Sequence, residues 1–198
     1  MKTVCVLGSP RTDGNSSAIA RYFCNAMENR GAEVRTFALN KLTYKGCQEC
    51  MACKIKLDKC ALKDDLAEVL EALHEADLLV IATPVFFGDV SSQTKGFIDR
   101  MHSFLVPDYR TNPQRSRLTP GKKLVFIQVQ ARPDETKFAD IFPRYEEFFA
   151  WYGFKERYHI RCCGVREAED VEKRSEVFKR ADRVVNQIMA AGESRAGE

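Results

Sequence analysis

Apolar and polar positions follow two alternating periods along the chain, and these predict strands and helices in turn. Short apolar runs that end at turn residues are typical of strands buried on both faces, whereas apolar residues about 3.6 positions apart are typical of helices. The predicted strands span residues 2–7, 32–39, 77–83, 122–130 and 155–163. The predicted helices span residues 18–29, 64–76, 93–105, 138–152 and 168–191.

This alternation predicts an α/β domain built on an open parallel sheet with helices on both faces. We expect a flavodoxin-like three-layer sandwich, five-stranded, in the order 2-1-3-4-5. Residues 77–83 form the most apolar run and are expected at the centre, ended by Pro84, whereas residues 32–39 alternate and are expected nearer an edge. The domain is expected to cover residues 1–191, with a cysteine-rich insert at 44–63 and a flexible tail at 192–198.

Charge and composition exclude several classes of protein. The 31 basic and 28 acidic side chains leave a net charge of +3, too small for bulk attraction to nucleic acid or to a membrane surface. No run approaches the roughly 20 apolar residues of a membrane span, and the first residues do not form a signal peptide. We therefore expect a cytoplasmic protein, in which its eight cysteines would stay reduced.

The loop after the first predicted strand, residues 8–17, has the sequence GSPRTDGNSS and precedes a helix. Free backbone N–H groups at a helix N-terminus bind anions, and Ser and Asn side chains add donors. Five residues separate the two glycines and Asn15 stands where a P-loop requires Lys, so this is not a P-loop. It predicts a terminal phosphate held by neutral donors and Arg11; the alternative is an ordinary capped turn.

The loop after the third predicted strand, residues 83–91, carries two adjacent aromatic residues. Phe86 and Phe87 would be unusual as exposed side chains unless they cover a flat group, and Gly88 allows backbone to approach a ligand closely. The alternative is that both rings turn inward and complete the core.

Together, GSPRTDGNSS and TPVFFGDVSSQTKGFIDR resemble the flavodoxin-like group of NAD(P)H-dependent FMN reductases and iron–sulfur flavoproteins. The resemblance covers roughly residues 1–100 and implies FMN as cofactor. It implies that the FMN phosphate is held by Ser9, Arg11, Asn15, Ser16 and Ser17. It also implies that the isoalloxazine ring is lined by Pro84, Val85, Phe86, Phe87 and Gly88. The loop after the fourth strand would complete the site with Gln130, Ala131 and Arg132.

Four cysteines, Cys47, Cys50, Cys53 and Cys60, form a C-x2-C-x2-C-x6-C motif. The spacing is tighter than in most zinc modules, whereas three cysteines at successive x2 spacing can wrap a four-iron cubane. Iron–sulfur flavoproteins carry a compact motif of this kind in the same segment, so the resemblance implies a [4Fe–4S] cluster. Free thiols, a zinc ion and a redox disulfide remain alternatives. Five lysines near the motif would balance thiolate charge or form a solvated face.

These features predict an FMN-dependent oxidoreductase in which the flavin carries the chemistry and no side chain acts as a catalytic group. NAD(P)H is the expected donor, and electrons would leave through the cluster or pass directly to a quinone or a free flavin. The three histidines show no pattern that would support hydrolysis. Alternatives are a non-enzymatic electron carrier between proteins and a zinc-stabilised binding module. Expected partners are small molecules and redox proteins, and the resemblance implies a homodimer or homotetramer.

Overall fold

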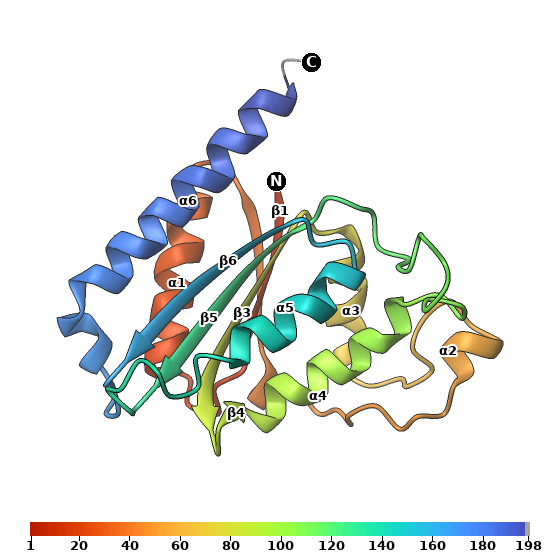
Figure 1. Ribbon diagram of the computed structural model, residues 1–198, viewed down its shortest axis with the longest axis horizontal. Coiled ribbons are helices and arrows are strands. Elements are labelled where there is room, and N and C mark those ends of the chain that lie inside the picture. The colour runs from red at the N-terminus through yellow and green to blue at the C-terminus, as the bar shows by residue number, and fades with distance from the viewer. Residues whose placement is uncertain (197–198) are drawn as a thin grey trace.

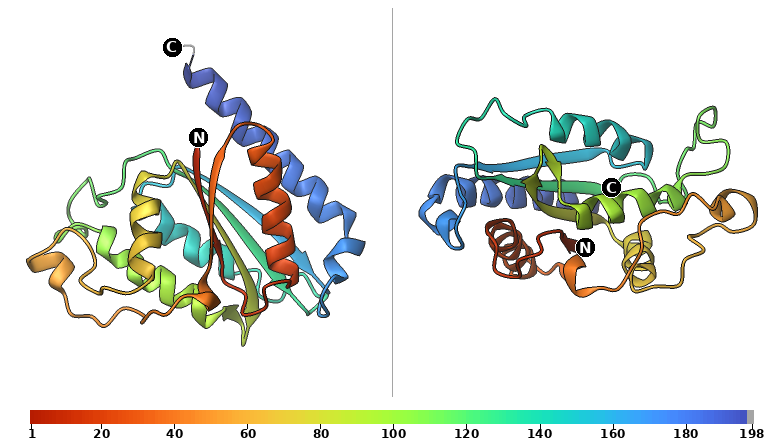
Figure 2. Two further views of the ribbon diagram at one scale, coloured as in Figure 1. Left: turned by 180° about the vertical axis from the view of Figure 1, so that it is seen from behind. Right: turned by 90° about the horizontal axis from the view of Figure 1, so that it is seen from below.

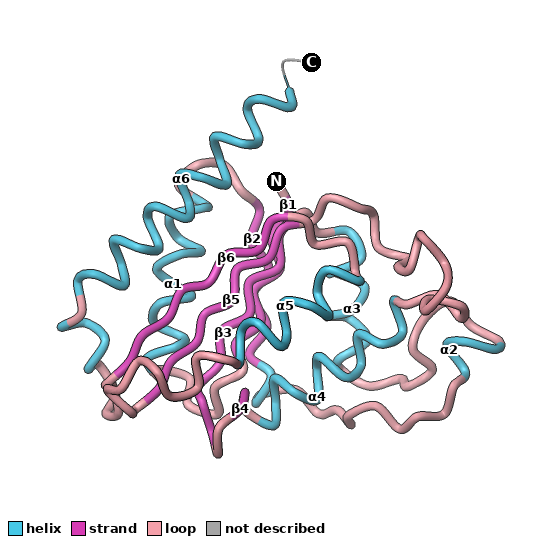
Figure 3. The backbone as a smooth tube through the Cα atoms, in the orientation of Figure 1, coloured by secondary structure: helices cyan, strands magenta, loops and turns pink. Residues whose placement is uncertain are grey.

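The computed structural model describes residues 1–196, with side chains up to residue 191. Within that range, five parallel strands form one sheet in the spatial order β2-β1-β3-β5-β6 (Figures 1 and 3). The strands are β1 (Lys2–Leu7), β2 (Glu33–Ala38), β3 (Leu78–Phe86), β5 (Lys123–Gln130) and β6 (Glu156–Cys163). A two-residue strand, β4 (Asp89–Val90), pairs antiparallel with the end of β3. Counting only the parallel strands, this is the expected order, and the flavodoxin-like fold is confirmed.

Helices cover both faces of the sheet and produce the three layers (Figure 2). They are α1 (Asn15–Glu28), α2 (Ala52–Ile55), α3 (Leu66–Glu75), α4 (Ser92–Arg100), α5 (Ile141–Trp151) and α6 (Ser175–Ala196). Short 3-10 turns lie at Leu39–Lys41, Met101–Phe104 and Asp170–Lys173. None of the helices in residues 1–196 is long and apolar enough to cross a membrane.

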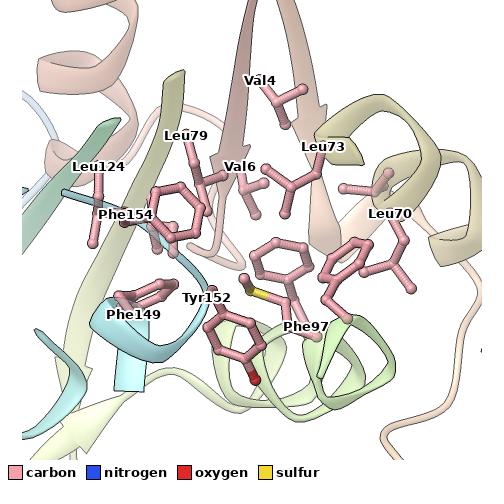
Figure 4. Packing of buried hydrophobic residues seen from close by; sticks show 14 of the residues in the cluster. Val4, Val6, Leu70, Leu73, Leu79, Phe97, Leu124, Phe149, Tyr152 and Phe154 are labelled. Carbon is pink, nitrogen blue, oxygen red and sulfur yellow. The ribbon is translucent and has the colours of Figure 1, made fainter. Parts of the chain in front are cut away.

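Alternation along the strands divides the core into two clusters, one on each face of the sheet. Val4 and Val6 point toward α3, α4 and α5, where Phe97, Phe149 and Phe154 are fully buried (Figure 4). Cys5 and Leu7 point the other way, toward α1 and α6. Because β1, β3 and β5 are buried on both faces, they are almost continuously apolar, as parallel strands require.

Several boundaries differ from those expected. Strand β3 continues through Pro84 to Phe86, with Pro84 opposite Val129, because β1 pairs with β3 only as far as Ala82 and leaves an edge that tolerates proline. The last helix begins at Ser175, after a 3-10 turn, and not at residue 168. It continues to Ala196, five residues past its expected end, and residues 197–198 of the expected tail lie outside the described residues.

Candidate functional site

The N-terminus of α1 lies beyond the carboxyl end of β1 and presents backbone N–H groups without a side-chain cap. The N-cap residue is Gly14, which forms no capping hydrogen bond, and the first turn holds no acidic side chain. A Cβ on Gly14 would lie 3.0 Å from Ser9 Oγ and 3.3 Å from Arg11 Cβ, so glycine keeps this space open. An uncapped N-terminus with its positive dipole end is suited to an anion. The alternative of an ordinary side-chain-capped turn is therefore wrong.

A cavity of about 280 Å³ extends from this helix end and is here called the flavin cavity, after the cofactor that the sequence resemblance implies. Its lining comprises Ser9, Arg11, Gly14, Asn15, Ser16, Pro84, Val85, Phe86, Val129, Ala131, Val165 and Arg166. The structure thus brings together most of the residues expected around FMN, from the loop after β1, the first turn of α1, the end of β3 and the loop after β5. Ser17, Phe87, Gly88, Gln130 and Arg132 are not part of this lining.

Besides lining the flavin cavity, Asn15 joins two segments that are far apart in the chain. Its Nδ2 donates to the carbonyl of Glu167 at 2.8 Å, and its Oδ1 accepts the N–H of Val171 at 3.1 Å. The buried amide therefore joins α1 to the loop between β6 and α6. This contact brings Val165 and Arg166 to the flavin cavity, and no motif in the sequence indicated either residue.

Gln130 also acts on a loop and not on the cavity. Its Nε2 donates to the carbonyls of Arg132 and Asp134 at 3.0 and 3.1 Å, and its Oε1 accepts from Arg161 at 2.8 Å. The buried amide shapes the turn after β5, so that the neighbouring Ala131 lines the cavity.

The aromatic pair after β3 belongs to a tight hairpin. Phe87 and Gly88 form a two-residue turn between the paired residues Phe86 and Asp89, with φ angles of +48° and +85°. Both φ angles are positive, as in a type I′ turn, whose two central positions favour Asn followed by Gly. Phe86 is 47% exposed and Phe87 fully exposed, so the alternative of two rings buried in the core is wrong.

A bulky residue with positive φ stores backbone strain, which concentrates at functional sites. We expect Phe87→Asn to raise the free energy of unfolding by about 1 kcal/mol, because Asn tolerates the left-handed conformation. Urea denaturation of the wild type and variant measures this difference. Phe148→Asn is the matched control: Phe148 is also exposed but lies on α5, so this variant should gain no stability. Equal gains in both variants would contradict the role of strain at Phe87.

The four motif cysteines line a second cavity, of about 510 Å³, here called the cysteine cavity. Its lining comes from the segment around α2, from the end of α4 and the turn after it, and from the loop that precedes β5, and it shares no residue with the lining of the flavin cavity. Cys47 and Cys50 are exposed, whereas Cys53 and Cys60 are partly buried. Burial raises the pKa of the Cys53 thiol, and the other three thiols add to that increase.

Cations surround this cavity. Lys54 donates to the carbonyls of His102 and Leu105, and burial lowers its pKa. Arg117 donates to the carbonyl of Cys53 at 3.1 Å and so ties the segment to the neighbouring loop. Arg100 donates to Cys60 Sγ at 3.0 Å. Of the five lysines noted in the sequence, Lys54 is partly buried here, and the other four are exposed.

The donor set of the cysteine cavity consists of four thiols with cations beside them. In the described part of the chain, no group of three or more His, Cys, Asp or Glu side chains is arranged to hold a metal ion. A zinc ion would draw four ligands to within about 2.3 Å of one point, whereas each thiolate of a cubane binds a different iron. The four thiols that line this cavity are a donor set of the kind that a cubane uses.

Residues 1–139 match the family described as NADPH-dependent FMN reductase. An iron-sulfur flavoprotein from Methanocaldococcus jannaschii is 39% identical over 106 residues, which cover 54% of this chain and 53% of that protein. An iron-sulfur flavoprotein from Methanosarcina thermophila is 32% identical over 100 residues, covering 50% of this chain and 52% of that protein. The chain thus spans about half the length of these curated relatives.

Solved structures share the fold at low sequence identity. The NAD(P)H:quinone oxidoreductase from Methanothermobacter marburgensis superposes with a TM-score of 0.75 at 18% identity, covering 96% of this chain and 97% of that one. An FMN-dependent NADH-azoreductase from Bacillus anthracis, in complex with FMN, gives 0.71 at 14% identity, covering 94% and 98%. These likenesses concern the fold alone. The family match, by contrast, extends over more than half of the sequence, and the chain therefore belongs to the NADPH-dependent FMN reductase family.

Proposed function

We propose that the protein is an FMN-dependent oxidoreductase with NAD(P)H as electron donor. The acceptor is a [4Fe–4S] cluster at Cys47, Cys50, Cys53 and Cys60, or directly a small molecule such as a quinone or a free flavin. The single observation that carries the proposal is the uncapped N-terminus of α1, which shares one cavity with the Pro84–Phe86 end of β3. We further propose a cytoplasmic homodimer or homotetramer that also exchanges electrons with redox proteins.

The phosphate of FMN would be held at the α1 end of the flavin cavity. Ser9 and Ser16 are buried there and offer hydroxyl groups, while the exposed Arg11 adds a positive charge. Arg11 N–H donates to Ser9 Oγ at 3.1 Å, which orients that hydroxyl within the loop. The helix N-terminus supplies backbone donors aligned with its dipole.

The isoalloxazine ring would lie against the end of β3. Pro84, Val85 and Phe86 give this side of the cavity an apolar surface that excludes water. When bound, FMN supplies hydride acceptance and one-electron release, so the protein is left to bind and orient.

The lining of the flavin cavity is consistent with chemistry that needs no general acid or base. Among its described residues there is no His, Cys, Asp or Glu side chain, and the charged groups present are the arginines Arg11 and Arg166. Arginine stays protonated at all ordinary pH values and is therefore a poor proton donor or acceptor. A hydride transfer to a bound cofactor requires neither role.

Quantifying flavin and iron per chain after anaerobic purification tests both halves of the proposal. We expect about one FMN, with absorbance near 450 nm, and about four iron atoms per chain. Arg11→Glu should weaken FMN binding by about tenfold or more, because it replaces a cation near the phosphate by an anion. Iron should be retained, because Arg11 is exposed and its loss leaves the core intact. Cys53→Ser should lose iron while FMN is retained. Each variant is thus the control for the other cofactor.

Other outcomes would replace the proposal. A protein that takes up no FMN contradicts the oxidoreductase, and zinc in place of iron favours a zinc-stabilised binding module. A holoprotein with both cofactors that does not oxidise NADH or NADPH in the presence of quinone or free flavin would instead be an electron carrier between proteins.

A further inference from the structure

Arg100, at the end of α4, is the largest fully buried side chain among the described residues. Its side chain is 0% exposed, and arginine is almost never fully buried unless its charge is paired. Arg100 is one of the residues that line the cysteine cavity, and it does not line the flavin cavity. Its burial therefore calls for an explanation connected with the cysteine segment.

Four of the interactions of Arg100 are with oxygen atoms. Nη1 donates to Asp64 Oδ2 at 2.8 Å and to the carbonyl of Lys45 at 2.7 Å. Nη2 donates to Asp64 Oδ1 at 3.0 Å and to the carbonyl of Leu62 at 3.4 Å. Although partial burial of Asp64 acts in the opposite direction, the guanidinium holds the pKa of Asp64 below its ordinary value.

These partners lie just outside both ends of the motif. Lys45 precedes Cys47 by two residues, and Leu62 and Asp64 follow Cys60 by two and four. One rigid guanidinium therefore joins the entry and the exit of the cysteine segment to α4. Lysine has a single ammonium group and cannot present this planar fork of donors.

The remaining donor, Nε, has a different kind of acceptor, the sulfur of Cys60 at 3.0 Å. A neutral thiol is a weak acceptor, so it is a poor partner for a charged, buried N–H group. A thiolate bound to iron is an anionic acceptor, and the same hydrogen bond then becomes charge-assisted. This hydrogen bond is therefore stronger when the sulfur of Cys60 is an anionic ligand of iron.

We propose that Arg100 is a positioning residue that fixes Cys60 as a cluster ligand and raises the reduction potential of the cluster. This inference rests on the proposed cluster at the cysteine cavity. Reduction adds negative charge to a cluster, and a buried cation that donates a hydrogen bond to a ligand sulfur stabilises the reduced form. Asp64 holds the guanidinium in the orientation that directs Nε at the sulfur.

The decisive variant is the double substitution Arg100→Gln with Asp64→Asn. It removes one cation and one anion, so the net charge of the protein does not change. The matched control is Lys59→Gln, which removes one net charge at an exposed side chain adjacent to Cys60. The midpoint potential of the cluster is measured in all three holoproteins by redox titration, together with iron loss to a chelator and FMN content.

We expect the double variant to have a more negative midpoint potential than the wild type and an iron affinity lower by about 10–100-fold. Lys59→Gln should match the wild type in both. FMN content should stay the same in all three, which shows that the fold is intact. If the double variant does not fold, Arg100→Lys replaces it, and the potential should shift in the same direction by a smaller amount, because the cation is kept but the hydrogen bond from Nε to the sulfur is lost.

Two results overturn the inference in distinguishable ways. A wild-type protein that holds no cluster after reconstitution with iron and sulfide rejects the cluster of the proposed function, and the role of Arg100 with it. A wild-type protein that holds a cluster whose potential is unaltered by the double variant, or altered only by Lys59→Gln, rejects the role of Arg100 alone.

Discussion

Replacing Gly8 by alanine is expected to lower the free energy of unfolding by about 3 kcal/mol, as overpacking of a core does. A Cβ on Gly8 would lie 1.8 Å from Thr94 Oγ1, 3.1 Å from Thr94 Cβ and 3.2 Å from the carbonyl of Ala82. Thr94 is fully buried and bonds to Ser91, whose hydroxyl donates to the carbonyl of Gly8 at 2.6 Å. The end of β1 and the start of α4 are therefore too close for a side chain.

Chemical denaturation measures the effect, and Gly46→Ala is the matched control. Gly46 has no positive φ, and an added Cβ would meet only the Cα of Gly96 at 4.0 Å, so its substitution should cost far less. Because Gly8 begins the loop that leads to Ser9, Gly8→Ala should also weaken FMN binding. A variant as stable as the wild type would show that α4 can move away from β1 at little cost.

Stability is also expected to fall by about 2 kcal/mol as the pH decreases from 6.5 to 4, because the Nε2 atom of the half-buried His159 is enclosed without a hydrogen-bond partner. The ring stacks on Phe142 with centroids 4.4 Å apart. Burial, with Arg161 and Arg180 adding to it, lowers the pKa of His159 from 6.5 to about 4.

Stability falls at low pH because the unfolded chain takes up a proton before the folded chain does. Between these two pKa values the unfolded chain binds a proton at His159 and the folded chain does not, so lower pH favours unfolding. The stabilisation is complete above pH 6.5 and is lost as the pH falls toward 4. The lowered pKa of His102, caused mainly by burial, contributes in the same direction.

Urea denaturation at several pH values checks this slope. His159→Phe keeps a ring against Phe142 but cannot titrate, so its stability should depend less on pH in this window. His74→Gln removes an exposed histidine and should leave the slope unchanged. A slope that is the same in His159→Phe and wild type would assign the acid sensitivity to other groups.

The parallel sheet could be predicted because short apolar runs alternate with amphipathic helices, whereas its strand order was expected as one of the common orders of such sheets. The boundaries of the helices were harder to predict, since they depend on individual capping residues. Helix α1 begins at Asn15, three residues earlier than its apolar period indicates. The final helix begins at Ser175 because Glu169, with φ of +70°, and the 3-10 turn after it interrupt the pattern.

The candidate site, like the fold, could be predicted in part. That the loop after β1 and the end of β3 lie together could be predicted, because they meet at the switch point of such a sheet. The family resemblance assigned Ser9, Arg11, Ser16 and Pro84 to this site, and all four line the same cavity. The hydrogen bonds that Asn15 and Arg100 form could not be predicted from the sequence. Each bonds to backbone groups far along the chain, as in the contact from Asn15 to Val171, and sequence spacing contains no record of such contacts.

By itself, the sequence determined the layered α/β architecture, the loop that favours an anion and the spacing of four thiols, because each depends on residues close together in the chain. Only the tertiary structure decided that Val165 and Arg166 join the flavin cavity, that Phe87 is strained and exposed, and that a buried guanidinium faces Cys60. These features arise where separate segments pack together, and the energy of a buried charge or a strained turn depends on neighbours that the chain meets only after folding.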